Sequence, residues 1–150
     1  MSKKKILGVI LLSILFVLAG CSKKELSKIE MIEGSYNTDL GLITISKDKK
    51  LVGFEGSGII YFKEDADKFD ESKLKYYFGS NADKNELKEN EAIVAIGIQD
   101  KSIYKIQWTA SDKTKKVDSI TITMTDTLKK TKSHRESLYK KYSGVRIQNK

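Results

Sequence analysis

Few side chains in this chain could do chemistry. The 150 residues contain one cysteine, Cys21, and one histidine, His134. Hydrolytic triads and zinc sites need more histidine or cysteine than that. The sequence has no Gly-x-Ser-x-Gly elbow and no phosphate-binding glycine loop. Ser-x-x-Lys occurs in it, but without the partner motifs of a serine nucleophile. We therefore expect a protein that is not an enzyme and that has no catalytic residues and no cofactor.

An acidic cluster is the one place where a hard cation could bind, because Ca²⁺ takes several carboxylate oxygens. The cluster lacks the spacing of a calcium loop, and lysines are interleaved with its acids. We expect a solvated loop face and no metal site. Its members are Glu64, Asp65, Asp67, Asp70 and Glu71.

The lone thiol follows a segment with the layout of an export signal. Three lysines at positions 3–5 precede an apolar run that ends in Leu18-Ala19-Gly20-Cys21. These four residues resemble the lipobox of bacterial lipoproteins. The resemblance implies cleavage between Gly20 and Cys21, and lipidation of Cys21 with fatty acyl chains such as palmitate. It places the protein on the extracytoplasmic face of the bacterial cell membrane, held by a lipid anchor.

The length of the apolar run favours this interpretation over a permanent membrane helix. Residues 6–19 are 14 residues, whereas crossing the hydrocarbon layer takes about 20. An exported chain with one thiol can form no internal disulfide, and acylation gives that thiol a role. An uncleaved N-terminal anchor with a chance cysteine is the alternative. A remote alternative is that residues 13–20 resemble the peptide pheromones released from some lipoprotein signals.

Processing at Cys21 divides the chain into three parts. Residues 1–20 are the signal peptide, 21–33 a lipidated tether, and 34–150 a single β-rich domain. The tether is expected to be partly ordered, either as a short helix on the domain or as a stalk. About 130 residues is an ordinary size for one domain with its own core.

Alternating apolar and polar residues predict most of the domain as strands. Such alternation is typical of antiparallel sheets with one buried face. Short polar loops between the segments favour pairing in chain order. The predicted strands cover residues 41–46, 51–54, 57–63, 74–78, 92–98, 102–109 and 117–125.

Two helices are also predicted. A weak one begins near residue 80 and ends near Asn90. A stronger one begins at Ser133, which has capping-box spacing with Glu136, and ends before Gly144. Val145 and Ile147 then suggest a final short strand.

The resulting fold class is mainly β (α+β): a small antiparallel meander sheet or barrel of about seven strands with a C-terminal helix. Gly34-Ser35-Tyr36 before the first predicted strand loosely resembles the Gly-x-Trp or Gly-x-Tyr element that opens lipocalin-like domains. That resemblance implies a barrel. Other β-sandwich or open-sheet folds remain alternatives.

Charge is distributed unevenly along the processed chain. Residues 21–127 carry 17 lysines against 19 acids, whereas residues 128–150 have a net charge of +7. Beside a membrane such a segment would meet anionic lipid or wall polymer. Nucleic acid fits the charge but not the compartment. The candidate contact residues are Lys129, Lys130, Lys132, Arg135, Lys140 and Lys141.

These observations favour a non-enzymatic surface lipoprotein that binds an anionic envelope component or another exported protein. The alternative is a lipocalin-like binder of a small molecule at a barrel mouth. In that case Tyr61, Tyr76, Tyr77 and Trp108 would line the mouth, although core packing is the more usual role for such residues.

Overall fold

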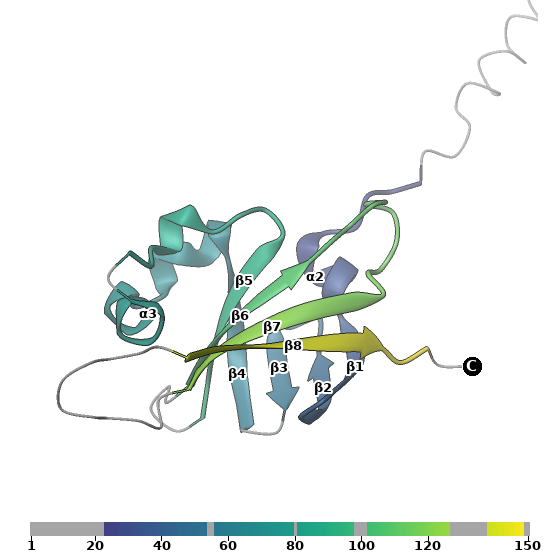
Figure 1. Cartoon of the computed structure of the whole chain (residues 1–150). Coiled ribbons are helices and arrows are strands. Elements are labelled where there is room, and N and C mark those ends of the chain that lie inside the picture. The colour runs from purple at the N-terminus through teal and green to yellow at the C-terminus, as the bar shows by residue number, and fades with distance from the viewer. Residues whose placement is uncertain (1–22, 54–55, 80, 98–101, 127–137, 149–150) are drawn as a thin grey trace, which may run out of the picture.

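Eight antiparallel strands pair in chain order and close into a barrel in the computed structural model of the chain (Figure 1). The structure describes residues 23–53, 56–79, 81–97, 102–126 and 138–148. The mainly β fold class is thus confirmed, with a closed barrel as its form. The strands are β1 (Gly34–Thr38), β2 (Gly41–Ile45), β3 (Lys50–Gly53), β4 (Gly56–Phe62), β5 (Glu91–Ile96), β6 (Ser102–Trp108), β7 (Ser119–Asp126) and β8 (Leu138–Arg146).

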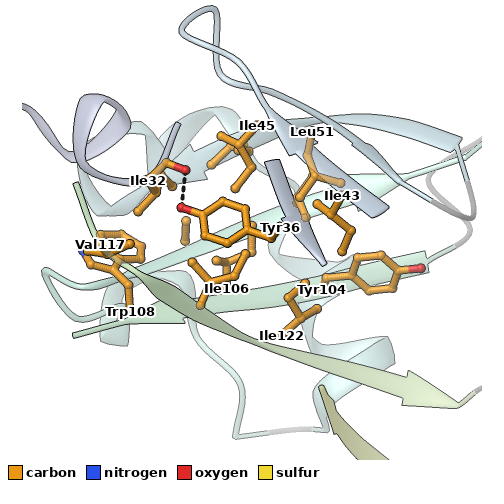
Figure 2. Packing of buried hydrophobic residues seen from close by; sticks show 14 of the residues in the cluster. Ile32, Tyr36, Ile43, Ile45, Leu51, Tyr104, Ile106, Trp108, Val117 and Ile122 are labelled. Carbon is orange, nitrogen blue, oxygen red and sulfur yellow. Dashed lines mark hydrogen bonds between the residues drawn. The ribbon is translucent and has the colours of Figure 1, made fainter. Parts of the chain in front are cut away.

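The inward positions of the strands form one hydrophobic core. Directly opposite residues share a face, and pairs such as Ile106↔Ile122 set the register. Tyr36, from β1, lies among these side chains and donates a hydrogen bond of 2.7 Å to the Ile32 carbonyl (Figure 2). Its ring is fully buried, as is Ile106. Because an eight-stranded barrel is about wide enough for side chains to fill, this packing accounts for much of its interior.

A second apolar cluster lies on the outside of the barrel. The segment between β4 and β5 contains the 3₁₀ helix η1 (Lys63–Lys68), α3 (Glu71–Phe78) and the 3₁₀ helix η2 (Lys84–Glu86). We call residues 63–90 the covering segment. Its side chains bury outward residues of β5 and β6, which explains why every residue of β5 is buried. The cluster consists of Phe69, Leu74, Leu87, Ile93, Ala95 and Ile103.

One end of the barrel is closed by the short helix α2 (Lys28–Ile32). Ser27 caps it with Glu30 in a capping box, and Met31 and Ile32 enter the core. The sequence-based tether, residues 21–33, therefore contains a helix that packs on the domain. The described contacts that close the barrel run from Leu26 to Ile147, so residues 22–150 contain the whole barrel.

The predicted C-terminal helix is wrong over its described part. Residues 138–146 form β8, which pairs with both β7 and β1. A helix there would leave the edges of those two strands unpaired. Gly144, predicted to end the helix, lies inside the barrel, where an added Cβ would meet Ile120, Thr38 and Tyr36 at 3.1–3.2 Å. Residues 133–137 lie outside the described residues.

Two smaller predictions also need correction. The strand expected at residues 74–78 is part of helix α3, which Asp70 caps through the Ser72 N–H. Leu74, Tyr77 and Phe78 recur at helical spacing and pack on β5 and β6. Between residues 81 and 90 the structure has only the short helix η2.

Within the described ranges, no helix combines the length and the apolar composition needed to cross a membrane.

Candidate docking face and outer pocket

Five neighbouring strands contain no acidic residue. Within the bounds given above, β8, β1, β2, β3 and β4 have neither Asp nor Glu, although the chain has 20 acids. The acids of this part of the sequence, Asp39, Asp48 and Glu55, fall between strands. The charged residues in the five strands are Lys50, Lys140, Lys141 and Arg146.

The outward side of these strands carries apolar side chains that nothing in the described chain covers. Register places Val145 and Leu42 on either side of Asn37, and Val52 beside Thr44 and Ser57. Exposed apolar groups on one face of a soluble domain indicate a surface that binds something. The exposed side chains of this docking face are Leu42 (56%), Val52 (49%), Ile59 (48%), Val145 (61%) and Ile147 (45%).

Two lysines share this outward side. Lys50 pairs with Ile59, and Lys141 lies on the same side of β8 as Val145. Lys140 points the other way, because successive residues of a strand face opposite sides, and it pairs with the core residue Met124. The structure therefore separates Lys140 and Lys141, which a helix would have placed on one surface.

The other predicted site residues belong to the predicted cleavage point and to the basic stretch after β7. Gly20, Cys21 and the basic positions Lys129, Lys130, Lys132 and Arg135 lie outside the described residues, as does His134. The structure describes the strand ends on either side of residues 127–137, which are Asp126 of β7 and Leu138 of β8. These ends lie away from α2 and the C-terminus (Figure 1).

The docking face reaches the barrel end at which the described N-terminal residues, 23–27, lie before α2. Ile147 continues the pairing of β8 with a hydrogen bond of 2.8 Å to the Ser35 carbonyl. At the same end the Leu26 N–H donates to the Lys113 carbonyl at 2.8 Å. Four residues lie between Cys21 and Leu26, so the five steps from one to the other reach at most about 17 Å at ~3.4 Å per residue. This chain length sets an upper limit on the distance between Cys21 and that end of the barrel.

Arg146 holds that end together. Its Nη2 donates to the Met31 carbonyl at 3.0 Å and to the Tyr36 hydroxyl at 2.7 Å, and its other nitrogens bond the carbonyls of Glu33 and Val117. The guanidinium lies 4.9 Å from the centre of the Tyr36 ring. Burial raises the pKa of Tyr36 to about 12, against the opposing effect of Arg146. β8 and α2 are therefore locked to each other.

The aromatic residues expected at a barrel mouth lie elsewhere. Trp108 is in the core, edge-on to Phe62 with ring centres 6.1 Å apart. Tyr76 and Tyr77 belong to α3, on the outside of the barrel. Tyr61 is outward on β4 and packs edge-on against Phe69 at 5.3 Å. The structure thus does not assemble these four side chains into one interior site.

Tyr61 and Phe69 instead line a pocket on the outside of the barrel. It has a volume of about 330 Å³ and lies between β4, the end of β5 and the beginning of α3. Its charged lining residues are Lys68, Asp70 and Lys73. Sequence reasoning missed this pocket because its walls come from segments that only the folded barrel brings together. The remaining lining residues are Ser57, Gly58, Ile59, Ala95 and Gly97.

The acidic cluster does not assemble into a cation site among the described residues. Asp65 is instead buried, with its Oδ2 2.6 Å from Lys49 Nζ. Burial alone would raise the pKa of Asp65, but hydrogen bonds from Lys49 and the Phe62 N–H outweigh it, so that pKa lies below its usual value. The pair ties the covering segment to the turn between β2 and β3.

Comparison with protein-family models, curated proteins and solved structures finds no match to this chain.

Proposed function

We propose that this chain is a lipid-anchored surface protein of a bacterial cell, and that its barrel binds the anionic surface of the membrane holding its anchor. It acts by binding and not by catalysis. The supporting observation is the acid-free outer face of β8 and β1–β4, with its exposed apolar side chains and its two lysines. The lipobox-like residues that end at Cys21 supply the anchor in this proposal.

The bilayer fits this face better than other envelope partners for two reasons. The short chain between Cys21 and Leu26 keeps the α2 end of the barrel within about 17 Å of the headgroups. Apolar side chains bordered by lysines match a surface with an apolar boundary under negative headgroups, where each basic group contributes about 1 kcal/mol. The basic residues at positions 129, 130, 132 and 135 would add their charge to the same attraction.

The barrel also suits the lipocalin-like architecture that Gly34-Ser35-Tyr36 suggests. Up-and-down barrels of eight antiparallel strands are the form that lipocalins have, and these three residues open β1. We propose this likeness for the architecture only, because the described interior is packed with side chains.

Vesicle binding tests the docking proposal. Residues 22–150 should sediment with vesicles that contain phosphatidylglycerol and much less with neutral phosphatidylcholine. Replacing Leu42, Val52 and Val145 with serine should weaken binding at least about tenfold, since each side chain loses apolar area that the bilayer covers. Tyr76→Ser is the matched control, because Tyr76 is as exposed as Val52 but lies on α3.

Other outcomes would identify other partners or reject the proposal. Undiminished vesicle binding by the triple-serine variant would reject the apolar face as the contact. Binding to purified anionic wall polymer but not to vesicles would assign the face to the polymer. Reversing Lys129, Lys130, Lys140 and Lys141 to glutamate should also weaken vesicle binding. Binding equal to that of the wild type would show that these four lysines do not contact the membrane.

A further inference from the structure

We propose that the outer pocket between β4 and α3 is a binding site for a small hydroxylated anion, a phosphate ester of a polyol such as glycerol phosphate. The pocket lies outside the barrel interior and shares Ile59 with the docking face. It requires neither lipidation nor membrane docking.

The lining supports an anionic ligand. Lys68 and Lys73 contribute two ammonium groups and Asp70 one carboxylate, so the charged lining has a net charge of +1. Lys68 is only partly engaged, since its Nζ lies 3.5 Å from Asp65 and two thirds of its side chain (67%) is exposed. A phosphate can accept hydrogen bonds from both ammonium groups at once, and such charge-assisted bonds are stronger than neutral ones.

The same lining supports hydroxyl groups on that ligand. Asp70 is held in place by the Ser72 N–H and hydroxyl at 3.0 and 2.7 Å, which keeps its carboxylate ionised and lowers its pKa. It can accept a hydrogen bond from a ligand hydroxyl, and Ser57 can donate or accept one. The apolar floor comes from Phe69, Tyr61 and Ala95.

Size restricts the ligand to a small unit. A volume of about 330 Å³ is at the lower end of the range for ligand sites, roughly 300–1,000 Å³. A glycerol phosphate group fits that range, whereas a long acyl chain or a large cofactor does not. Such a group occurs as a lipid headgroup or as a soluble or polymeric ester, and both present the same chemistry to the pocket.

Titration of residues 22–150 with glycerol phosphate, followed by NMR of the labelled protein, tests the proposal. We expect saturable shifts at the pocket residues with a Kd on the order of 1 mM, as befits so small a ligand. Neutral glycerol should bind at least about tenfold more weakly. Equal binding of glycerol and glycerol phosphate would overturn the anionic assignment.

Two variants locate the binding. Lys68→Gln with Lys73→Gln should weaken binding at least about tenfold, because the phosphate loses two charge-assisted bonds. The matched control, Lys113→Gln with Lys115→Gln, removes the same charge from the loop between β6 and β7 and should change the Kd less than about twofold. Ser57→Trp, on an exposed strand position, should block the pocket without changing charge. Unchanged binding in Ser57→Trp would overturn the pocket as the site.

Vesicles then distinguish the two sources of the ligand. If the Lys68/Lys73 variant also loses affinity for phosphatidylglycerol vesicles, the ligand is a headgroup. If it loses affinity for glycerol phosphate but not for the vesicles, the ligand is a soluble or polymeric ester. Either result retains the pocket, and the triple-serine variant of the docking face separately reports on membrane docking.

Discussion

The two outer sides of the barrel use the same strand alternation with opposite results. On β5 and β6 the outward residues Ile93 and Ile103 are buried beneath the covering segment. On β2 and β3 the outward residues Leu42 and Val52 are about half exposed. In Figure 1, α3 lies beside β4 and β5, whereas β1, β2 and β3 lie at the other side of the barrel. The first side is covered by its own chain, whereas no described residue covers the apolar groups of the second, which is the basis of the proposed docking.

The largest contrast between the two sides should appear in stability. Leu74→Ala removes a buried side chain of the covering segment and should lower the free energy of unfolding by about 3 kcal/mol. Leu42→Ala changes the docking face and should cost no more than about 0.5 kcal/mol. Urea denaturation of residues 22–150 measures both. Equal losses would mean that the docking face is already covered within the folded chain.

The shared interior offers a change that should affect stability without affecting binding. The pKa of Tyr36 is about 12 in the fold and about 10 in an unfolded chain. Because the folded pKa is the higher one, the stability present below pH 10 should fall by about 2–3 kcal/mol as the pH rises from 10 to 12. Tyr36→Phe should abolish this part of the pH dependence. It should also cost about 1–2 kcal/mol at pH 7, since Ile32 and Arg146 lose a hydrogen-bond partner.

Denaturation from pH 8 to 12 in parallel with the wild type gives this difference. Vesicle binding by folded Tyr36→Phe should be unchanged. A loss of vesicle binding in this variant would show that the docking face depends on the packing of Tyr36 at the α2 end.

Some strands of the barrel could be predicted from the sequence and others could not. Apolar patterning predicted β2 to β7, most clearly β6 and β7, in which apolar and polar residues alternate. It failed for β8, where Ser133, Glu136 and the spacing of Leu138 and Tyr142 imitate a helix. The strand forms because β1 and β7 both need a neighbour, a long-range requirement that no local pattern contains.

One property of the docking face, its lack of acidic residues, could be predicted from the sequence. Between residues 34 and 62 the acids occur only at positions 39, 48 and 55, all between strands. This depletion was a usable signal. Which apolar residues stay exposed could not be predicted, since Ile59 and Ile93 look alike in the sequence, but the covering segment buries Ile93 and leaves Ile59 about half exposed. The outer pocket could not be predicted either, because its lining combines residues 57–61 of β4 and residues 95–97 at the end of β5 with residues 68–73 of the covering segment.

Electrostatics should separate the docking face from other lysine-bearing surfaces. Lys50→Gln with Lys141→Gln should weaken binding to anionic vesicles by about 2 kcal/mol, roughly 30-fold, at low salt. The control pair Lys113→Gln and Lys115→Gln, in the loop between β6 and β7, should have a much smaller effect. Sedimentation at 20 and 300 mM salt should show the difference shrinking as screening increases. Equal effects of the two pairs would indicate attraction by total charge alone.

The smallest expected effect concerns how the covering segment is attached. The pKa of Asp65 is depressed in the fold, so the Lys49–Asp65 pair stabilises the protein above the unfolded pKa of about 3.9 and is lost as the pH falls through the lower folded value. Asp65→Asn should cost about 1 kcal/mol at pH 7 and almost nothing once both states are protonated. Thermal unfolding between pH 2 and 7 checks this. A constant difference across that range would contradict the ionic role of Asp65.

The depth of two equally exposed positions in a bilayer tests the central claim most directly. Residues 22–150 contain no cysteine, so Val52→Cys and Tyr76→Cys can each carry one environment-sensitive fluorophore. With phosphatidylglycerol vesicles that hold a lipid-borne quencher, the label at position 52 should shift to the blue and be quenched, while the label at 76 stays unchanged. Equal quenching at both positions, or none at position 52, would contradict membrane docking through the docking face.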